Sequence, residues 1–326
     1  MRGWAASLLA VAALSCGDVS RVRTWSCAEQ GRWLSDVWGS APDDVYAVGY
    51  DGTILHSRDR GATWSSTVAP PVGRYSVSPW LTAVRGSDRL DVRAVGSDGA
   101  ILHSTDGGAA WVTEKTDTDV RFFGLWFRDR NEVYVAGEKG TVLHTEDGGA
   151  TWAKQDTPTS MTLWDVWGSG PEDVYIVGGD THVFADEPPS GGVILHSTDH
   201  GRTWTSIEPP GSDRSFSAVW GSGPENVFVG GNGGTFLRSR DRGKTWTKVS
   251  LGVTLGIGSI WGIGPDVYVG GGLSGIGTLL HSTDGGDSFS VILDQSIGMS
   301  GLWGDANGET VYAVGTGGIL IGRSGD

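Results

Sequence analysis

The sequence of 326 residues contains only two cysteines, and no part of it shows a helical hydrophobic period or a charged amphipathic stretch. Basic residues are also scarce: 24 Lys and Arg against 38 Asp and Glu give a formal charge of -14. This charge argues against a sequence-independent nucleic-acid binder and against electrostatic adhesion to anionic lipid. Glycine and tryptophan are abundant, with 54 and 16 copies. Because glycine at this density breaks helices and supplies turns, the composition predicts an all-β fold.

The first fifteen residues are typical of a bacterial export signal, with a basic start, an apolar run over residues 5–14 and a small residue before Cys16. The run is too short to span a membrane as a helix. Residues 13–16 resemble a lipobox, although Ala13 stands where leucine is usual. The resemblance implies a lipid-modified Cys16, and Gly17 after it implies export to the outer membrane. A Cys16–Cys27 disulfide or an idle thiol at Cys27 remains the alternative.

One repeated pattern has the form VWG…DVYAVG and is typified by residues 37–49. Its seven copies begin at Val37, Val84, Leu125, Val166, Val219, Ile260 and Leu302. These segments are short and apolar or alternating, as expected of strands. They predict the first two strands of seven repeating units.

A second pattern, Ser/Thr-x-Asp-x-Gly-x-Thr-Trp, alternates with the first. Its aspartates are Asp59, Asp106, Asp147, Asp199, Asp241, Asp284 and Asp326, at intervals of about 41 to 52 residues. This pattern resembles the Asp box, or BNR repeat, of sialidase-like β-propellers. The aspartate is expected to accept backbone N–H bonds in its own turn, the glycine to adopt a positive φ, and the tryptophan to pack on a neighbouring strand.

The last Asp box stops at Asp326, before its tryptophan. Residues 21–30 resemble residues 201–210, which begin with the second half of a complete box, and Thr24-Trp25 supplies the missing Thr-Trp pair of a fourth strand. Residues 22–30 are therefore predicted to form that strand and to pair beside residues 319–322, because an open ring would expose a sheet edge. The expected architecture is a signal peptide over residues 1–15, then one seven-bladed β-propeller over residues 16–326 with four antiparallel strands per blade.

The repeat gives a structural explanation for several residues that otherwise suggest a metal or ligand site. Five histidines occupy one position on the third strand of separate blades: His56, His103, His144, His196 and His281. Ligands of one zinc ion must all lie about 2 Å from it, so these histidines are interpreted as structural. The Asp boxes lack the twelve-residue calcium loop, and the repeated tryptophans are interpreted as core. No metal site and no cofactor are predicted.

Function is expected where the repeat is broken. The loops after the second and fourth strands of each blade share one face and vary most, notably over residues 69–80, 117–123, 180–191 and 208–216. The candidate binding residues are Arg74, Tyr75, Trp80, Arg85, Arg121, His182, Phe184 and Arg214. These are mostly the aromatic and arginine residues that interfaces favour, although ordinary loop drift would give the same pattern.

Units such as residues 44–64, DVYAVGYDGTILHSRDRGATW, make the chain similar to the Ycf48/Hcf136-like group of propellers. The resemblance implies a non-enzymatic assembly scaffold, here exported and lipid-anchored, monomeric, and attached to membrane only through the lipid. No partner-binding motif matches, so the partner is an unknown protein or glycan. The alternatives are a lectin-like propeller and a sialidase-like or xyloglucanase-like hydrolase. The hydrolase alternative is weakened because Arg-Ile-Pro is absent, because xyloglucanase-like enzymes use two propellers, and because two carboxyls about 5 to 10 Å apart would be needed.

Overall fold

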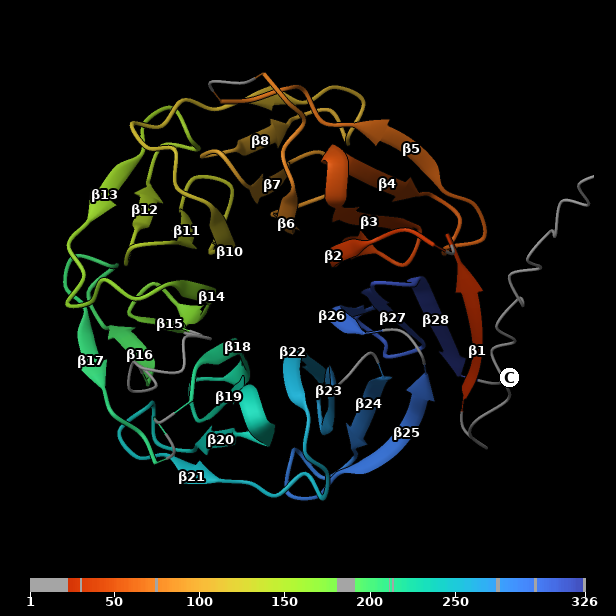
Figure 1. The fold of residues 1–326 in the computed structure, drawn as a ribbon, viewed down its shortest axis with the longest axis vertical. Helices are drawn as coiled ribbons and strands as arrows, with labels where there is room; N and C mark the ends of the chain where they lie inside the picture. The colour runs from red at the N-terminus through yellow and green to blue at the C-terminus, as the bar shows by residue number, and fades with distance from the viewer. Residues whose placement is uncertain are drawn as a thin grey trace, which may run out of the picture.

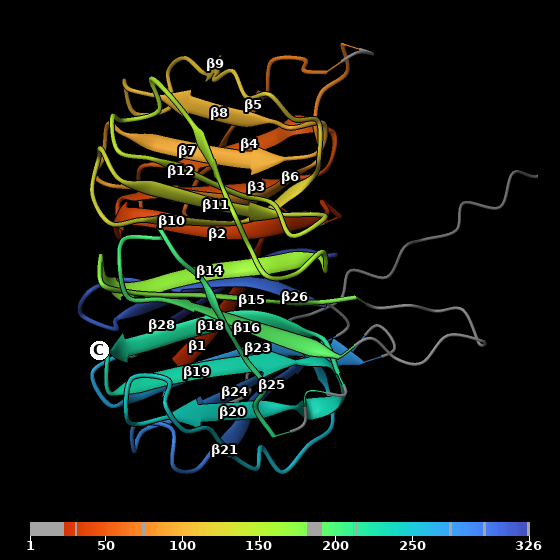
Figure 2. The same ribbon diagram turned by 90° about the vertical axis from the view of Figure 1, so that its left-hand side faces the viewer.

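The computed structural model describes residues 23–29, 31–73, 76–180, 191–210, 212, 214–273, 276–295 and 298–324. These residues form seven four-stranded antiparallel sheets, arranged as blades around a central axis (Figure 1). Seen from the side, the blades form one ring whose strands run between two opposite faces (Figure 2). The predicted seven-bladed propeller is confirmed. Among the described residues, no helix is long and apolar enough to cross a membrane.

Each blade has strands a to d in order from the axis outward. Strands a are β2 (Leu34–Ala41), β6 (Leu81–Gly86), β10 (Phe122–Phe127), β14 (Leu163–Gly170), β18 (Phe216–Gly223), β22 (Gly256–Ile263) and β26 (Met299–Gly304). Strands b are β3 (Asp44–Gly49), β7 (Val92–Gly96), β11 (Val133–Gly137), β15 (Asp173–Gly179), β19 (Asn226–Gly231), β23 (Asp266–Leu273) and β27 (Thr310–Gly315). Strands c are β4 (Thr53–Ser57), β8 (Ile101–Ser104), β12 (Val142–Thr145), β16 (Gly192–Ser197), β20 (Phe236–Ser239), β24 (Ile276–Ser282) and β28 (Gly318–Ser324). Strands d are β5 (Ser65–Val68), β9 (Val112–Thr113), β13 (Ala153–Gln155), β17 (Thr205–Ile207), β21 (Thr247–Lys248), β25 (Ser290–Gln295) and β1 (Arg23–Ala28), and the short 3₁₀ turns η1 (Tyr50–Gly52) and η2 (Asn232–Gly234) follow β3 and β19.

The ring is closed by the two ends of the chain, as the sequence predicts. Strand β1 pairs antiparallel with β28, with Trp25 opposite Gly322 and Ala28 opposite Ile319, and the two strands lie side by side in Figure 1. A Cβ atom at Gly322 would lie 2.7 Å from the ring of Trp25, so glycine is required there. Blade seven is therefore completed by the segment that the sequence assigned to it.

Neighbouring blades are joined by a repeated tryptophan–glycine contact. The strand-a tryptophan of one blade covers the strand-a glycine of the next, so that a Cβ atom at Gly39 would lie 2.7 Å from the ring of Trp303. Farther out, the Asp-box tryptophan of one blade meets the strand-b tyrosine of the preceding blade edge to face, as Trp111 meets Tyr46 at 6.4 Å between ring centroids. These contacts confirm the interpretation of the tryptophans as core.

The Asp boxes have the predicted internal bonds. In the first box, Asp59 accepts hydrogen bonds from the backbone N–H and the hydroxyl of Thr63, at 2.8 and 2.6 Å, and Gly61 has φ of +78°. Hydrogen bonds from the Thr151 side chain and backbone lower the pKa of Asp147 to about 2. A carboxylate with a lowered folded-state pKa stabilises the fold above its unfolded pKa and loses that effect as the pH falls through the folded one. Asp59, Asp106, Asp147, Asp199, Asp241 and Asp284 all bond in this way, whereas Asp326 lies outside the described residues.

One detail of the sequence prediction is wrong. The sequence places the Asp-box Thr-Trp pair on strand d, but strand d begins after the tryptophan in the first five blades and after Phe289 in the sixth. In blade one, pairing with strand c starts at Ser65, which lies opposite His56, because Trp64 instead directs its indole toward Tyr312 of the preceding blade. Only in β1 does the strand include the tryptophan.

The strand-c histidines have partners within their own blades. His56 Nε2 lies 2.8 Å from Asp44 Oδ1, and its ring stacks on Tyr46 at 4.0 Å. The same aspartate–histidine pair recurs at His103, His196 and His281. No group of metal-ligating side chains suited to an ion occurs in the described ranges. This geometry supports the structural interpretation of the histidines.

Candidate functional site

A ring of β-bulges surrounds the central axis near one face of the propeller. In all seven blades, the pairing of strand a with strand b skips one residue near the start of strand a. The skipped residues are Ser35, Thr82, Phe123, Trp164, Ser217, Gly258 and Ser300, and all seven line one cavity. Bulges re-aim side chains, and this repeated bulge directs residues into the channel.

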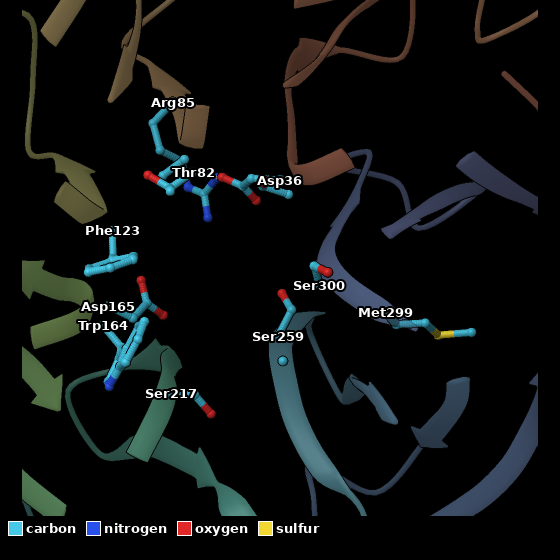
Figure 3. A pocket seen from close by; sticks show the side chains of 13 residues that line it. Asp36, Thr82, Arg85, Phe123, Trp164, Asp165, Ser217, Ser259, Met299 and Ser300 are labelled. Carbon is cyan, nitrogen blue, oxygen red and sulfur yellow. The ribbon is translucent and has the colours of Figure 1, made fainter. Parts of the chain in front are cut away.

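This cavity, which we call the channel mouth, has a volume of about 260 Å³ and is shown in Figure 3. Besides the seven bulge residues it is lined by Asp36, Ala83, Arg85, Asp165, Ser259 and Met299. Most of these positions differ from blade to blade, so the channel mouth breaks the sevenfold symmetry of the ring. A larger hollow of about 620 Å³ lies beside the Asp box of blade five, but its walls come mainly from the repeated, structural positions.

Asp36 and Arg85 form a pair across two blades at the channel mouth and point toward each other in Figure 3. Asp36 Oδ2 also accepts the backbone N–H of Val84 at 2.9 Å. Burial raises the pKa of Asp36, and the Arg85 guanidinium opposes that rise. Arg85, a candidate binding residue in the sequence, therefore lies at the channel mouth, and Asp36 is a site residue that the sequence did not single out.

Asp165 occupies the same strand position in blade four, where the charge of Arg85 acts on it from a distance without forming an ion pair. Its Oδ2 accepts the backbone N–H of Val219 in the next blade, and its Oδ1 accepts that of Val166, both at 2.9 Å. No cationic side chain in the described part of the chain forms an ion pair with Asp165. Burial raises the pKa of Asp165 to about 7. The channel mouth therefore contains a carboxyl group that titrates near neutral pH.

The carboxylates considered for hydrolysis do not gather in the channel mouth. Asp117 and Asp119 lie exposed on the loop before β10, and Asp186 and Glu187 lie outside the described residues. The carboxyl groups that do line the cavity bond to the backbone of the next blade or to Arg85. A general acid or base must instead reach a substrate proton, so these contacts are better suited to holding blades together.

An exposed row of side chains lies on the same face, before strands a and after strand b of blade one. Trp33 and Tyr50 meet edge to face at 5.3 Å, Tyr50 stacks on Trp80 at 4.3 Å, and the Arg121 guanidinium carbon lies 4.9 Å from the Trp80 ring centroid. We call Trp33, Tyr50, Trp80 and Arg121 the aromatic strip. Trp33 and Tyr50 are 56% and 37% exposed, which is unusual for side chains of this size.

The aromatic strip is connected to the channel mouth. Trp80 Nε1–H donates to the hydroxyl of Ser35 at 2.8 Å, and Ser35 lines the cavity. Farther round, Phe123 and Trp164 form a second ring pair at 4.4 Å inside the channel mouth. One surface therefore runs from exposed aromatic rings to a partly buried carboxylate.

The structure brings together some of the predicted binding residues and not others. Trp80 and Arg121 lie in the aromatic strip and Arg85 in the channel mouth, whereas exposed Arg214 packs over Gly233 of η2. Arg74, Tyr75, His182 and Phe184 lie outside the described residues, as does the candidate lipidation residue Cys16, while Cys27 is disulfide-bonded. Sequence reasoning missed Trp33 and Tyr50. Their signal was large aromatic rings at loop positions outside the repeated tryptophan sites.

The boundary between blades two and three departs furthest from the repeat. Arg85 stands in place of a strand-a tryptophan, and Phe127 stands in place of the glycine that such a tryptophan covers in the other blades. Farther out, fully buried Arg93 replaces the strand-b tyrosine. Arg85 pairs with Asp36 of blade one, and the Phe127 ring instead meets the Arg93 guanidinium carbon at 5.4 Å from its centroid.

Comparison with known proteins agrees with the resemblance found in the sequence. The family model described as the photosystem II assembly factor YCF48 matches residues 83–161. No curated protein matches the sequence. Among solved structures, a YCF48 bound to a D1 peptide is 16% identical with a TM-score of 0.73, covering 94% of this chain and 96% of that one. YCF48 from Cyanidioschyzon merolae is 16% identical with a TM-score of 0.72, covering 93% and 99%.

An enzyme is also among the similar structures. The GH74 xyloglucanase from Xanthomonas campestris is 14% identical with a TM-score of 0.67, and the match covers 93% of this chain but 54% of that one. This chain therefore corresponds to about half of that enzyme. At these identities the likeness establishes the shared propeller fold.

Proposed function

We propose that this protein is a non-enzymatic binding scaffold that holds a segment of a partner protein on the aromatic strip and the channel mouth. The observation that carries this proposal is the strip itself, in which two exposed aromatic rings, a partly exposed tryptophan and an arginine lie in continuous contact. Tryptophan, tyrosine and arginine dominate the binding energy of protein interfaces. The similarity to YCF48, one of whose structures contains a bound peptide, supports a peptide-like ligand.

Photo-crosslinking tests which face of the scaffold meets the partner. A photo-reactive amino acid in place of Trp33 is expected to give a covalent protein adduct in cells. The same residue in place of Leu90, which is 52% exposed on the opposite face in the loop between β6 and β7, is expected to give none. The Trp33 adduct should disappear when Arg121 is also changed to alanine. An adduct of equal yield at both positions, or none at position 33, would contradict the proposal.

The alternative functions predict different outcomes for the same face. A lectin-like propeller would retain an immobilised polysaccharide through the strip and yield no protein adduct. A hydrolase would release sugar from a polysaccharide, and one carboxylate substitution would abolish the release. The location of Asp36 and Asp165, both hydrogen-bonded to backbone, favours the scaffold over the hydrolase.

We also propose that the scaffold is exported and anchored through a lipid on Cys16, a residue that the signal-like sequence places at the expected cleavage site. The disulfide at Cys27 favours the alternative in which the two cysteines of the sequence pair. Membrane fractionation distinguishes the two. If Cys16 is lipidated, Cys16→Ser should move the protein from the membrane to the soluble fraction, and Cys27→Ser should not. If both variants fractionate like the wild type and each gains one free thiol, the anchor is excluded.

A further inference from the structure

The channel mouth carries more negative than positive charge. Two of its side chains are carboxylates and one is a guanidinium, and that guanidinium is engaged by Asp36. Asp165 is the carboxylate left without an ion-pair partner in the ranges that the structure describes. Its two hydrogen bonds come from backbone N–H groups, which orient the carboxylate without neutralising its charge. Ionising a carboxylate that is half-buried in this way costs free energy that a cation would offset.

The wall beside Asp165 suits the apolar stem of a long basic side chain. Phe123 and Trp164 line the cavity with rings 4.4 Å apart, and Figure 3 shows both on the same wall as Asp165. Trp164 is held in place because its Nε1–H donates to the Gly179 carbonyl at 2.8 Å. Aromatic faces attract ammonium and guanidinium groups, and the methylene stems of lysine and arginine pack along apolar surface.

The remaining walls provide oxygen atoms. The residues Ser35, Thr82, Ser217, Ser259 and Ser300 line the cavity. Four of their hydroxyls already have one partner within the protein, but a hydroxyl oxygen has two lone pairs and can still accept a hydrogen bond from an ammonium group. An anionic group would be repelled by the charge of Asp165. An apolar group would bury that carboxylate further without giving it a partner. The charge of Asp165, the aromatic wall and the acceptor groups therefore all favour a cationic side chain with an apolar stem.

We propose that the channel mouth is a receptor for one lysine or arginine side chain of the partner segment, whose cationic head meets Asp165 while its stem lies along Phe123 and Trp164. This inference rests on the proposed function and specifies the partner: its segment carries a basic residue beside the part that covers the aromatic strip. Asp165 is then the specificity-determining residue of the site.

The first test uses n-butylammonium, which has the stem and charge of a lysine side chain and needs no knowledge of the partner. Adding it to the full-length protein at pH 8 is expected to shift the indole N–H signal of Trp164 in a saturable way, whereas n-butanol should not. The signal is assigned with Trp164→Phe. Asp165→Asn should weaken the affinity at least tenfold, and Asp117→Asn, an exposed carboxylate on the same face, should leave it unchanged. No shift in the wild type, or equal affinity in Asp165→Asn, would overturn the proposal.

The pH dependence adds a readout that a purely structural role of Asp165 would not give. The charged groups that face Asp165 are Arg85 from β6 and Asp36 from β2. With the pKa of Asp165 at about 7, the ionised fraction, and with it the affinity for the cation, should rise about tenfold between pH 6 and pH 8. In Asp165→Asn the affinity should be flat over this range. A flat profile in the wild type counts against the proposal.

A peptide display experiment separates failure of this inference from failure of the proposed function. Random peptides selected on the wild type should be enriched in lysine or arginine, and this enrichment should vanish on Asp165→Asn while the selected aromatic contacts persist. If peptides bind and require Trp33 but contain no basic residue, the scaffold stands and the cation receptor is wrong. If no peptide binds and position 33 crosslinks to nothing, the proposed function fails, while n-butylammonium binding still judges the receptor independently.

Discussion

Trp25→Ala is expected to destabilise the whole propeller by about 3–5 kcal/mol, the usual cost of removing a large aromatic ring from a core. Trp25 is 8% exposed and packs in the cluster of Leu279, Leu293 and Leu302, which belongs to blades six and seven. The indole ring of Trp25 also packs directly against Gly322 of strand c, where any side chain would collide with it. Trp25 therefore attaches the N-terminal strand β1 to blades six and seven, and its loss weakens the packing that closes the propeller.

Thermal unfolding measures this effect, and the chain offers a matched control. At about 2 °C per kcal/mol for a protein of this size, the melting temperature of Trp25→Ala should fall by roughly 6–10 °C. Trp33→Ala makes the same chemical change at a ring that is 56% exposed, and it should melt within about a degree of the wild type because surface changes rarely exceed about 0.5 kcal/mol.

Removing residues 21–30 altogether should be more severe, because β28 would then present an unpaired edge to solvent. We expect that truncated protein to aggregate and to be cut by proteases near β28. The closure described here is wrong if Trp25→Ala melts like the wild type, or if the truncated chain is as resistant to proteolysis as the intact one.

The fold could be predicted because each of its contacts is repeated. One Asp box is a weak pattern, but seven copies at blade spacing allow only a ring, and the unfinished last copy indicated where residues 22–30 would pair. The sequence prediction was wrong for details that depend on contacts between blades. Strand d starts after Trp64 because of the contact between that ring and Tyr312, which no single blade reveals.

The candidate site could be predicted only in part, because it is the least repeated region. Asp36 and Asp165 are the two carboxylates at a strand position where other blades have Ala, Gly or Ser, so they looked like variation within the consensus. Trp33 and Tyr50 come from separate loops, and only the closed ring brings them into contact with Trp80. Arg85 was recognisable because it replaces a tryptophan that all six other blades keep.

Arg93 is a departure from the repeat that sequence reasoning missed, although strand b reads DVRAVG where other blades have tyrosine or phenylalanine. Its side chain is fully buried, and its Nε and Nη2 donate to Glu114 Oε1 at 3.1 and 3.0 Å. Its Nη2 also donates to the Gly148 carbonyl, its Nη1 lies 3.6 Å from Asp91, and its guanidinium lies 5.4 Å from the Phe127 ring centroid. Blades two and three are therefore held by a buried ionic network where other boundaries use aromatic packing.

Removing the Arg93 guanidinium from this network should lower the free energy of unfolding substantially. Arg93→Met leaves the carboxylates of Glu114 and Asp91 with His103, the Trp152 indole N–H and the Ser87 hydroxyl as their main partners, and an unpaired buried charge typically costs about 3–5 kcal/mol. Arg93→Met combined with Glu114→Gln should recover much of the loss, because the double change removes both charges. Arg89→Met removes a 51% exposed arginine that pairs with Asp43 outside this network, and it should cost less than about 1 kcal/mol. Denaturant unfolding of the four proteins measures these differences.

The pH dependence of Arg93→Met identifies the group that compensates. Burial disfavours the charged form of His103, but hydrogen bonds to Asp91 and Glu114 outweigh it and raise the pKa of His103, while the charge of Arg93 lowers it. Without Arg93 that pKa should rise further. A histidine with a raised folded-state pKa stabilises the fold below its unfolded pKa and loses that effect as the pH rises through the folded one. The stability of Arg93→Met should therefore fall more steeply than that of the wild type from pH 6 to pH 8. If the stabilities of the two proteins change in parallel over this range, or if Arg93→Met costs no more than Arg89→Met, the network contributes specificity of packing rather than stability.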